Sequence, residues 1–431
     1  MTFTYDDAHK YLDTLLVFGV KLGLKNMEAL CELLGNPQND LKFIHIAGTN
    51  GKGSCCSMLA AACKNAGLKT GFYSSPFLCE FTERWRVNGE EVTEEQVAAA
   101  IQEIVKAEDQ LIKRTDVKPT YFEVLTAAAL LIFKEAKVDI VIWETGMGGR
   151  LDATNIVTPL LSVITNIGKD HSQYLGDSLE KIAAEKAGII KKEVPVIIGE
   201  LDAETKAVIL EIASKQNAPV SQFKDESIVD LGVTEESKRY IRYTSPQQSN
   251  EMLFSMVGKY QLANIGLVLR VLEFVSFKLN LDFEVLVYGA TQAIWPGRFE
   301  IRENLILDGA HNEHALQALK ESLEEIFPNQ KFNIICGILA DKEWQSLLDK
   351  LLPIAANFYL VEIDNVRTSK PELLEEYLLK KGSTIIGRGS SKEALECVNK
   401  EITTVIVGSL YLIGEVLSLL SSGKALKIDK L

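Results

Sequence analysis

The amino-acid sequence predicts an α/β protein with mostly parallel sheets, divided into a larger N-terminal and a smaller C-terminal domain. Short apolar runs alternate with longer segments of helical periodicity, which is typical of parallel strands joined by helices that cover the sheet. The run from Val138 to Trp143 is apolar almost throughout, as expected of a strand buried on both faces. A turn at Pro296-Gly297 separates two such patterned halves.

The composition is that of a soluble globular protein. The chain has 431 residues, of which 47% are hydrophobic and 24% charged, and at about 150 residues per domain it fits two or three domains. The net charge of -13 argues against nucleic acid or an acidic membrane as a partner. The first residues, Met1 to Lys10, are polar, and no apolar run approaches the ~18 residues of a membrane span. We therefore expect neither a signal peptide nor a transmembrane helix.

The seven cysteines include no C-x-x-C pair. Cys55, Cys56 and Cys63 lie close together in an alanine-rich segment, where we expect them to pack behind the preceding loop. This pattern favours reduced thiols and a cytoplasmic location.

The first part of the chain is predicted to alternate between strands and helices after a helical start. Residues 5–35 have apolar positions at helical spacing and end at Gly35-Asn36-Pro37, a stop signal. Thr93 and Gln96 have the spacing of a capping box. Residues 79–92 suggest a loop or an edge segment. The expected strands are 43–47, 69–74, 138–143, 160–165 and 195–199, and the expected helices are 57–66, 120–136 and 178–187.

The second part is less regular at first and then alternates again. Residues 220–260 contain short β-like pieces, 239–244 and 252–257, that predict a small sheet region. Further helices are expected at 261–274, 313–325, 344–352 and 409–421, and strands at 305–308, 332–336, 358–361 and 404–407. The predicted domains are 1–295 and 301–431, joined by a hinge at 296–300.

A glycine-rich loop, Gly48-Thr49-Asn50-Gly51-Lys52-Gly53-Ser54, connects the first strand to a helix. Such a loop directs backbone N–H groups and a helix N-terminus at one point, which suits a phosphate. Lys52 would add a charge near the outer phosphates, and Ser54 a hydroxyl near a bound Mg²⁺. The spacing differs from the common phosphate loop, so an ordinary strand-to-helix turn is the alternative.

Polar residues directly follow several expected strands. In parallel sheets ligands bind beyond the carboxyl ends of the strands, so Ser54, Ser75, Glu144 and His171 are expected to meet at one site. Glu144 is either a charged strand end or a Mg²⁺ ligand, because hard cations prefer carboxylate oxygen. Histidine is an unusual ligand for Mg²⁺, so a structural or solvated role is the simpler interpretation of His171.

Three further charged residues are candidates for a functional role. Lys186 is most simply a solvated lysine on a helix. Asp308 follows a strand, where it could accept a hydrogen bond from a ribose hydroxyl or cap the next helix. Arg298 lies beside the hinge and could reach phosphates from the other domain.

The order of these segments resembles that of one enzyme family. The glycine-rich loop is similar to the ATP loop of the Mur ligase superfamily. Further segments narrow the resemblance to folylpolyglutamate synthase and the bifunctional dihydrofolate synthase/folylpolyglutamate synthase. These segments are Tyr73-Ser74-Ser75-Pro76, Glu144-Thr145-Gly146-Met147-Gly148-Gly149-Arg150-Leu151-Asp152-Ala153-Thr154-Asn155, Glu185-Lys186-Ala187-Gly188-Ile189-Ile190, Pro296-Gly297-Arg298-Phe299-Glu300, Leu307-Asp308-Gly309-Ala310-His311-Asn312 and Gly408-Ser409-Leu410-Tyr411. The resemblance covers nearly the whole chain.

The resemblance implies a P-loop ATPase-type N-terminal domain and a Rossmann-like C-terminal Mur ligase domain. It also implies a carbon–nitrogen ligase that uses ATP and Mg²⁺, at two sites, to join L-glutamate to dihydropteroate or to the glutamate tail of tetrahydrofolate. An acyl phosphate is the implied intermediate, and catalysis consists mainly of positioning and charge neutralisation. Family members are often monomers, so a monomer is expected.

The resemblance also implies roles for individual residues. Lys52, Lys186 and His311 would be catalytic, with Lys186 carbamylated. The ATP contacts would be Thr49, Asn50, Gly51, Lys52, Gly53, Ser54, Asn264, Arg298 and Asp308. The pteroate contacts would be Thr120, Tyr121, Phe122, Glu123, Leu151, Asp152 and Ala153, and Ser75, Glu144 and His171 would bind the metal.

One position departs from the family pattern, and two other functions stay open. Lys169 stands where an apolar residue commonly precedes Asp170-His171, so its charge could alter metal affinity or contact a phosphate. The alternatives are a Mur-type ligase acting on a cell-wall nucleotide and a nucleotide-binding regulator without catalysis. The regulator is disfavoured by the intact set of Lys52, Glu144, His171, Lys186 and Asp308.

Overall fold

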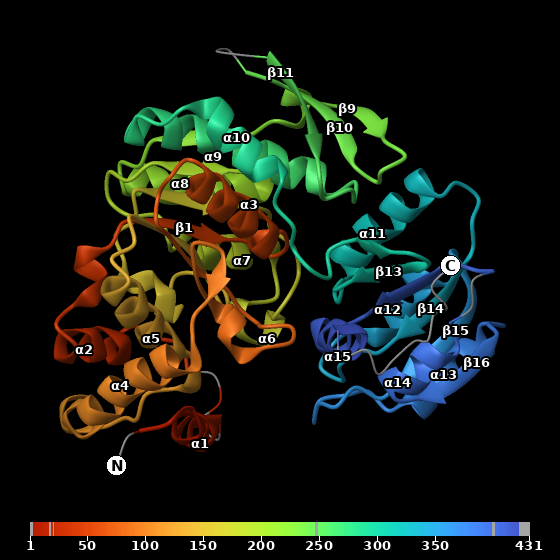
Figure 1. Cartoon of the computed structure of the whole chain (residues 1–431), viewed down its shortest axis with the longest axis horizontal. Coiled ribbons are helices and arrows are strands. Elements are labelled where there is room, and N and C mark those ends of the chain that lie inside the picture. The colour runs from red at the N-terminus through yellow and green to blue at the C-terminus, as the bar shows by residue number, and fades with distance from the viewer. Residues whose placement is uncertain (1–2, 17–18, 20, 246–248, 399–400, 422–431) are drawn as a thin grey trace. The chain divides into compact units, whose positions relative to one another are not determined.

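The structure, a computed structural model, describes residues 3–16, 19, 21–245, 249–398 and 401–421 (Figure 1). The chain forms two compact units. The first comprises Met1–Pro76, Thr82–Ile228 and Ala263–Ala293, and the second comprises Phe77–Phe81, Val229–Leu262 and Ile294–Leu431. None of the helices in the described part of the chain is long and apolar enough to cross a membrane.

The first unit is built on a sheet of eight strands in the order β4-β3-β2-β5-β1-β6-β7-β8. In the part of this order that runs β2-β5-β1-β6-β7-β8, all neighbouring strands pair in parallel. Antiparallel pairing is found only at one edge, where β3 pairs with β2 and with β4. The expectation of a mostly parallel sheet is therefore confirmed. The bounds are β1 Phe43–Ala47, β2 Thr70–Tyr73, β3 Trp85–Val87, β4 Glu90–Glu91, β5 Ile140–Glu144, β6 Leu161–Ile164, β7 Val196–Ile198 and β8 Val220–Gln222.

Helices surround this sheet, and their ends carry the expected signals. α3 packs on β1, β2 and β5, α10 packs on α3, and α7 packs on α8. The capping box of Thr93 and Gln96 is present at the start of α4. The bounds are α1 Tyr5–Leu15, α2 Lys25–Leu33, α3 Lys52–Asn65, α4 Glu94–Thr115, α5 Tyr121–Glu135, α6 Ser172–Leu175, α7 Leu179–Ala187, α8 Ala203–Lys215, α9 Gln261–Leu279 and α10 Phe283–Thr291.

The start of α3 differs from the prediction. We expected this helix from residue 57, but it begins at Lys52, directly after Gly51, whose φ of 79° belongs to the left-handed region. Glycine adopts that conformation without a steric penalty. As a result, Lys52, Gly53 and Ser54 form the first turn of the helix, so their N–H groups belong to its N-terminus.

The second unit contains a six-stranded sheet in the order β12-β13-β17-β14-β15-β16, parallel except for the edge strand β12. Neighbouring residues of β13 enter different cores: Ile306 packs in one hydrophobic cluster, and Leu305 and Leu307 pack in another. Because successive strand residues point to opposite faces, both faces of this sheet are covered. The second α/β domain is therefore confirmed.

The strands and helices of this part are as follows. The strands are β12 Glu300–Arg302, β13 Leu305–Asp308, β14 Phe332–Cys336, β15 Ala355–Val361, β16 Ile385–Gly389 and β17 Thr404–Val407. The helices are α11 Glu313–Ile326, α12 Trp344–Leu351, α13 Pro371–Lys380, α14 Ser391–Glu396 and α15 Leu410–Ser421. Helices α13 and α14 were not anticipated from the sequence.

A separate three-stranded antiparallel sheet, in the order β11-β10-β9, also belongs to the second unit. Its strands are β9 Ile228–Val233, β10 Arg239–Thr244 and β11 Ser249–Phe254. The sequence predicted a small sheet here but grouped it with residues 1–295. In the structure it packs with the C-terminal part of the chain, as do residues 77–81, of which Leu78 and Cys79 pack on the core of this unit.

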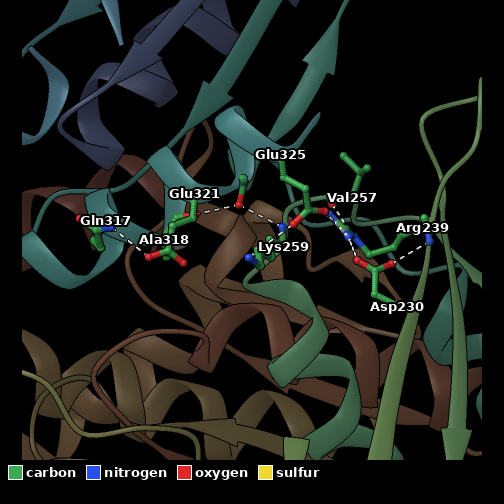
Figure 2. A network of polar contacts seen from close by, with 10 residues as sticks. Asp230, Arg239, Val257, Lys259, Gln317, Ala318, Glu321 and Glu325 are labelled. Carbon is green, nitrogen blue, oxygen red and sulfur yellow. Dashed lines mark hydrogen bonds and ion pairs between the residues drawn. The ribbon is translucent and has the colours of Figure 1, made fainter. Parts of the chain in front are cut away.

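Arg239 explains why this small sheet joins the second unit (Figure 2). Its side chain has no exposed surface, and its guanidinium group pairs with Asp230 of β9 and, at 2.7 Å, with Glu325 of α11. Its Nε atom donates to the carbonyl oxygen of Val257 at 2.9 Å. A buried cation needs such partners, so the network ties β9 and β10 to α11.

We predict that Arg239→Leu destabilises the second unit strongly, because it leaves two carboxylates without the cation that pairs with them. Breaking a buried pair costs about 3–5 kcal/mol, which corresponds to a drop of roughly 6–20 °C in the melting temperature of a unit of this size. Arg242→Leu is the matched control, since Arg242 lies on the same strand in an exposed pair with Glu251, a kind worth about 1 kcal/mol or less. Differential scanning fluorimetry would contradict the prediction if both variants melted alike.

Candidate active site

The glycine loop lies between β1 and α3, against the segment that follows β6. A Cβ atom added to Gly48 would lie 1.8 Å from Oγ1 of Thr165, and Thr165 donates to the carbonyl oxygen of Asn50 at 2.7 Å. The hydroxyl of Thr49 accepts from the N–H of Gly168 at 2.9 Å and donates to the carbonyl of Gly168 at 3.0 Å. These contacts fix the loop before any ligand binds.

Asn50, Ser54 and Asn264 complete the surroundings of this loop. The N–H of Asn50 donates to Oδ1 of Asn166 at 2.9 Å. Ser54 is 1% exposed in the first turn of α3. A Cβ atom on Gly51 would lie 2.3 Å from Oδ1 of Asn264, so this asparagine touches the loop although it lies 213 positions further along the chain.

Two lysines converge on one carbonyl oxygen of the loop. Nζ of Lys186 donates to the oxygen of Gly48 at 2.8 Å, and Nζ of Lys52 donates to the same oxygen at 3.1 Å. Lys186 is only 4% exposed, so the prediction of a solvated helix-face lysine is wrong. Burial, assisted by the charge of Lys52, lowers the pKa of Lys186 to about 7, since both effects disfavour a second ammonium ion.

Glycines bring Lys186 to this position. A Cβ atom on Gly149 would lie 2.7 Å from the carbonyl oxygen of Glu185 and 2.8 Å from that of Lys186. A Cβ atom on Gly188 would lie 2.2 Å from Cβ of Arg150, and Arg150 also forms an ion pair with Glu185 at 2.6 Å. The loop after β5 can therefore pack directly on the end of α7.

The three predicted metal ligands come from separate strand ends. Glu144, the last residue of β5, is 4% exposed, and its charge contributes to the raised pKa values of the Cys55 and Cys56 thiols, after burial as the main cause. Ser75 follows β2 and is half-buried, and His171, at the start of α6, has a side chain 46% exposed. Carboxylate and hydroxyl oxygens fit a hard divalent cation. Within the described residues no group of three or more His, Cys, Asp and Glu is arranged for a metal.

Thr120 and Glu123, two predicted substrate contacts, form the capping box of α5. Glu123 is 5% exposed, and its Oε2 accepts from the N–H of Thr120 at 2.7 Å and from Nδ2 of Asn26 at 2.9 Å. Both side chains thus fix the start of the helix. The neighbouring Tyr121 and Phe122 are only partly buried, and they remain the better candidates for direct contact with a ligand.

Aromatic rings and a glycine determine where Phe122 lies. Its ring centroid is 6.2 Å from that of Tyr73, which in turn lies 4.7 Å from the Trp143 ring. A Cβ atom on Gly146 would lie 2.4 Å from the Phe122 ring. The ring of Phe122 is therefore held beside the loop that contains Leu151, Asp152 and Ala153, so four of the predicted pteroate contacts belong to one neighbourhood.

Asp308, Arg298 and His311 form a second cluster, in the second unit. Oδ2 of Asp308 accepts from the hydroxyl of Tyr260 at 2.7 Å and from the N–H of Phe299 at 2.9 Å, and Oδ1 accepts from the N–H of Ala310 at 2.8 Å. Burial raises the pKa of Asp308, and Tyr260 and Arg298 oppose the rise. The alternative that Asp308 caps the next helix is wrong, because Asn312 is the N-cap of α11.

Arg298 and His311 both lie close to Gly309, the residue that follows Asp308. Nη1 of Arg298 would lie 2.3 Å from a Cβ atom on Gly309, so a side chain at that position would displace the guanidinium group. Nδ1 of His311 contacts the carbonyl oxygen of Gly309 at 2.7 Å, and because a carbonyl can only accept, Nδ1 carries the proton. The Nε2 atom is then the basic nitrogen of His311.

The sequence did not single out several residues that shape the site. Thr165, Asn166 and Gly168 hold the glycine loop, as described above, and His45 and Thr154 contact each other inside the sheet domain. The signal for Thr165 and Asn166 was the same as for Glu144, namely a polar residue directly after an apolar strand. Lys169, the position that departs from the family pattern, is exposed.

Comparisons with known proteins identify the family of this chain. Residues 46–272 match the Mur ligase middle domain, and residues 298–419 match the C-terminal domain of dihydrofolate synthetase. The chain is 33% identical to the dihydrofolate synthase/folylpolyglutamate synthase of Bacillus subtilis over 96% of this chain and 99% of that protein.

Solved structures share the fold over nearly the whole chain. The Escherichia coli protein FolC in complex with DHPP and ADP superposes with a TM-score of 0.86, 30% identity and 98% coverage of both chains. The bifunctional folylpolyglutamate synthase/dihydrofolate synthase of Yersinia pestis, complexed with AMPPNP and a Mn ion, gives a TM-score of 0.83 and 30% identity, over 97% of this chain and 98% of that one.

We predict that Lys52→Met raises the pKa of Lys186 by up to about one unit, because the charge of Lys52 is one cause of its depression. NMR titration of protein carrying ¹³C at lysine Cε, in buffer free of CO₂, measures this value directly. Lys181→Met is the matched control, since Lys181 also lies on α7 but is 64% exposed and paired with Asp177. A wild-type Lys186 signal that titrates like that of an exposed lysine would contradict the assignment of a buried amine.

Proposed function

Because the chain belongs to the dihydrofolate synthase/folylpolyglutamate synthase family of Mur ligases, we propose that it joins L-glutamate to dihydropteroate and to the glutamate tail of tetrahydrofolate. Like its relatives, it is an ATP-dependent ligase that forms a carbon–nitrogen bond. The observation that carries the proposal is the convergence of Lys52 and Lys186 on the glycine loop, beside a buried Glu144. This arrangement places the charge of Lys52, with Lys186 beside it, where an ATP phosphate chain would bind.

The proposed reaction has two consecutive steps. A carboxylate oxygen of the pteroate or folate substrate attacks the γ-phosphorus of ATP, and the bond to the β-phosphate oxygen breaks to release ADP. The amine of L-glutamate then attacks the acyl phosphate, the amide forms, and inorganic phosphate leaves with the electron pair while the amine loses a proton. A carboxylate oxygen is a poor leaving group and a phosphate is a good one, so the protein mainly has to position the reactants and balance charge.

In this proposal the glycine loop cradles the phosphates. Thr49, Asn50, Gly51 and Gly53 supply backbone contacts at the start of α3, and Lys52 turns from the carbonyl of Gly48 to the phosphates. Asn264 lies against the same loop and contacts the nucleotide. Ser54 lies at the end of the loop nearest the metal.

Ser75, Glu144 and His171 are the proposed ligands of Mg²⁺ at two sites, where the ion would neutralise charge on the phosphates. The Mn ion in the Yersinia pestis structure supports a divalent ion in this family. Glu144 contributes a buried carboxylate, which a hard cation favours. His171 is exposed enough to turn toward a ligand.

We propose that Lys186 reacts with CO₂ to form a carbamate. The neutral amine attacks the carbon of CO₂, a nitrogen–carbon bond forms, and one proton is released to solvent. A pKa of about 7 supports this reaction, because an amine must be neutral to attack and about half of the molecules meet that condition at pH 7. The resulting anion would orient metal ligands beside the glycine loop and the loop after β5.

The C-terminal residues supply the remaining proposed contacts. Asp308 has three donors on its carboxylate and about one acceptor site left for a ribose hydroxyl. Arg298 contributes a permanent positive charge for phosphates, and Nε2 of His311 can accept a proton from the incoming amine.

The proposed pteroate contacts are Thr120, Tyr121, Phe122, Glu123, Leu151, Asp152 and Ala153, with Phe122 stacking on the flat ring. Thr120 and Glu123 also fix the start of α5, the helix that carries Tyr121 and Phe122. We further propose a monomer that works in the cytoplasm, where reduced thiols persist; within the described residues, no disulfide joins any of the seven cysteines.

The function is tested by ADP release with Mg-ATP and L-glutamate, in parallel with 7,8-dihydropteroate and with tetrahydrofolate. Activity with both supports a bifunctional enzyme, and activity with tetrahydrofolate alone limits the enzyme to polyglutamate extension. Silence with both substrates, in protein that binds ATP, would refute the proposal. A UDP-muramoyl compound tests the cell-wall alternative in the same assay.

We predict that Lys186→Arg lowers kcat by at least about a hundredfold, since arginine keeps the charge but does not form a carbamate. Lys186→Ala is expected to lower kcat to the same extent. Added acetate or propionate should restore part of this activity, because their carboxylate replaces the missing carbamate group of Lys186. Wild-type protein grown with ¹³C-bicarbonate should show one carbamate carbon by NMR, lost on acidification. Lys215→Ala, which removes an exposed lysine on α8, serves as the control and should change neither readout.

A further inference from the structure

The proposed reaction gives no role to His45, a buried titratable side chain. This residue lies in the middle of β1, three positions before Gly48, and its side chain has no exposed surface. Its strand register pairs it with Trp143 on one side and Ser162 on the other. Burial, with a contribution from the charge of Lys191, lowers the pKa of the imidazole to about 3, so His45 is neutral at physiological pH.

A continuous chain of hydrogen bonds runs from His45 to Asp152. Nε2 of His45 lies 3.0 Å from Oγ1 of Thr154, and Oγ1 of Thr154 donates to Oδ1 of Asp152 at 2.5 Å. The N–H of Thr154 donates to the same Oδ1 at 3.0 Å, and the N–H of Met147 donates to Oδ2 at 2.8 Å. Nε1 of Trp143 donates to the carbonyl oxygen of Thr154 at 3.0 Å, which holds this residue from the other side.

The chain has a preferred direction. A threonine hydroxyl carries one proton, and if it donates to Asp152 it must accept from His45, which places the imidazole proton on Nε2. Nδ1 of His45 is buried and has no hydrogen-bond partner among the described residues, and as a bare acceptor it is the less costly group to leave unpaired. The reverse direction requires a protonated Asp152 and a buried Nδ1–H without an acceptor.

With this direction, Asp152 receives three donors, which favour its negative charge. Burial raises the pKa of Asp152, while the hydrogen bonds from Met147 and Thr154 lower it. A charged carboxylate accepts hydrogen bonds from N–H groups, such as those on the pyrimidine ring of a pterin, whereas a protonated carboxyl would present a donor. The charge and the orientation of Asp152 thus depend on the hydroxyl of Thr154.

We propose that His45 is a positioning residue for the pterin ring, because it holds the hydroxyl of Thr154 in the orientation that fixes Asp152 toward the substrate. This inference rests on the proposed pteroate contact of Asp152. It adds that the residue controlling this contact lies on β1, the strand that leads into the glycine loop. In this proposal, the short segment from His45 to the glycine loop therefore affects recognition of both the pterin and ATP.

The test compares two pairs of variants. His45→Leu and Thr154→Val remove the chain of hydrogen bonds, whereas His45→Gln and Thr154→Ser keep a donor and a hydroxyl. We expect the first pair to raise KM for dihydropteroate about tenfold, with KM for ATP changed less than about twofold, and the second pair to stay within about threefold of wild type. The double variant His45→Leu/Thr154→Val should equal either single variant, because both interrupt one chain.

Ser162→Ala is the matched control. Ser162 is also buried, lies beside His45 on β6 and donates to the carbonyl oxygen of Ile189 at 3.0 Å, so its hydroxyl proton is directed away from the chain that leads to Asp152. It should leave the ratio of the two KM values unchanged. Equal changes of both KM values in the His45 variants would assign the histidine to general stability and overturn the inference.

A measurement on wild-type protein covers the case in which His45→Leu does not fold. With ¹⁵N-labelled histidine, and with the His45 signal assigned from His45→Gln, the ring should show a protonated Nε2 and a bare Nδ1 from about pH 5 to about pH 9. A proton on Nδ1 would overturn the inference. The assay of wild type separates the two proposals, since an enzyme silent with pteroate and folate refutes the function, while an active enzyme with the wrong tautomer refutes only the role of His45.

Discussion

The candidate active site depends on backbone segments that approach one another more closely than a side chain would allow. Gly48 faces Thr165, Gly149 faces the carbonyls of Glu185 and Lys186, and a Cβ atom at either glycine would lie closer to its neighbour than non-bonded atoms allow. At Gly149 the obstructing atoms are backbone oxygens, which cannot rotate away. The close approach lets Nζ of Lys186 reach the carbonyl of Gly48.

The same packing produces an electrostatic imbalance. Nζ of Lys52 and Nζ of Lys186 donate to one carbonyl oxygen, and two ammonium ions so close together repel each other. The imbalance is expressed in the lowered pKa of Lys186. Binding of an anion, or conversion of one amine into a carbamate, relieves it. Lys52 then remains as a local positive charge for ATP in a chain with a net charge of -13.

Much of the fold could be predicted because apolar runs identify buried strands without knowledge of their neighbours. The bounds of β1, β13, β14 and β17 agree with the predicted ones, and the ends of the strands indicated where the site lies. The roles of single residues were harder to predict, because Lys186 becomes buried only when α7 packs on the loop after β5. Likewise, the position of β9 to β11 depends on Arg239 and Glu325, 86 residues apart, and no local pattern indicates this pairing.

Asp152 and Asp308 show how a short motif can specify a ligand contact. In each case Oδ1 accepts from the N–H two residues further on, at 3.0 Å from Thr154 and at 2.8 Å from Ala310, so the sequence next to the aspartate fixes one oxygen. Each carboxylate also accepts from a hydroxyl, of Thr154 for Asp152 and of Tyr260 for Asp308. Three donors keep a buried carboxylate charged and leave about one acceptor site for a substrate. The local N–H explains why the motifs are short, whereas the groups that hold the arrangement from outside, such as His45, come from distant segments and are recognised only in the folded chain.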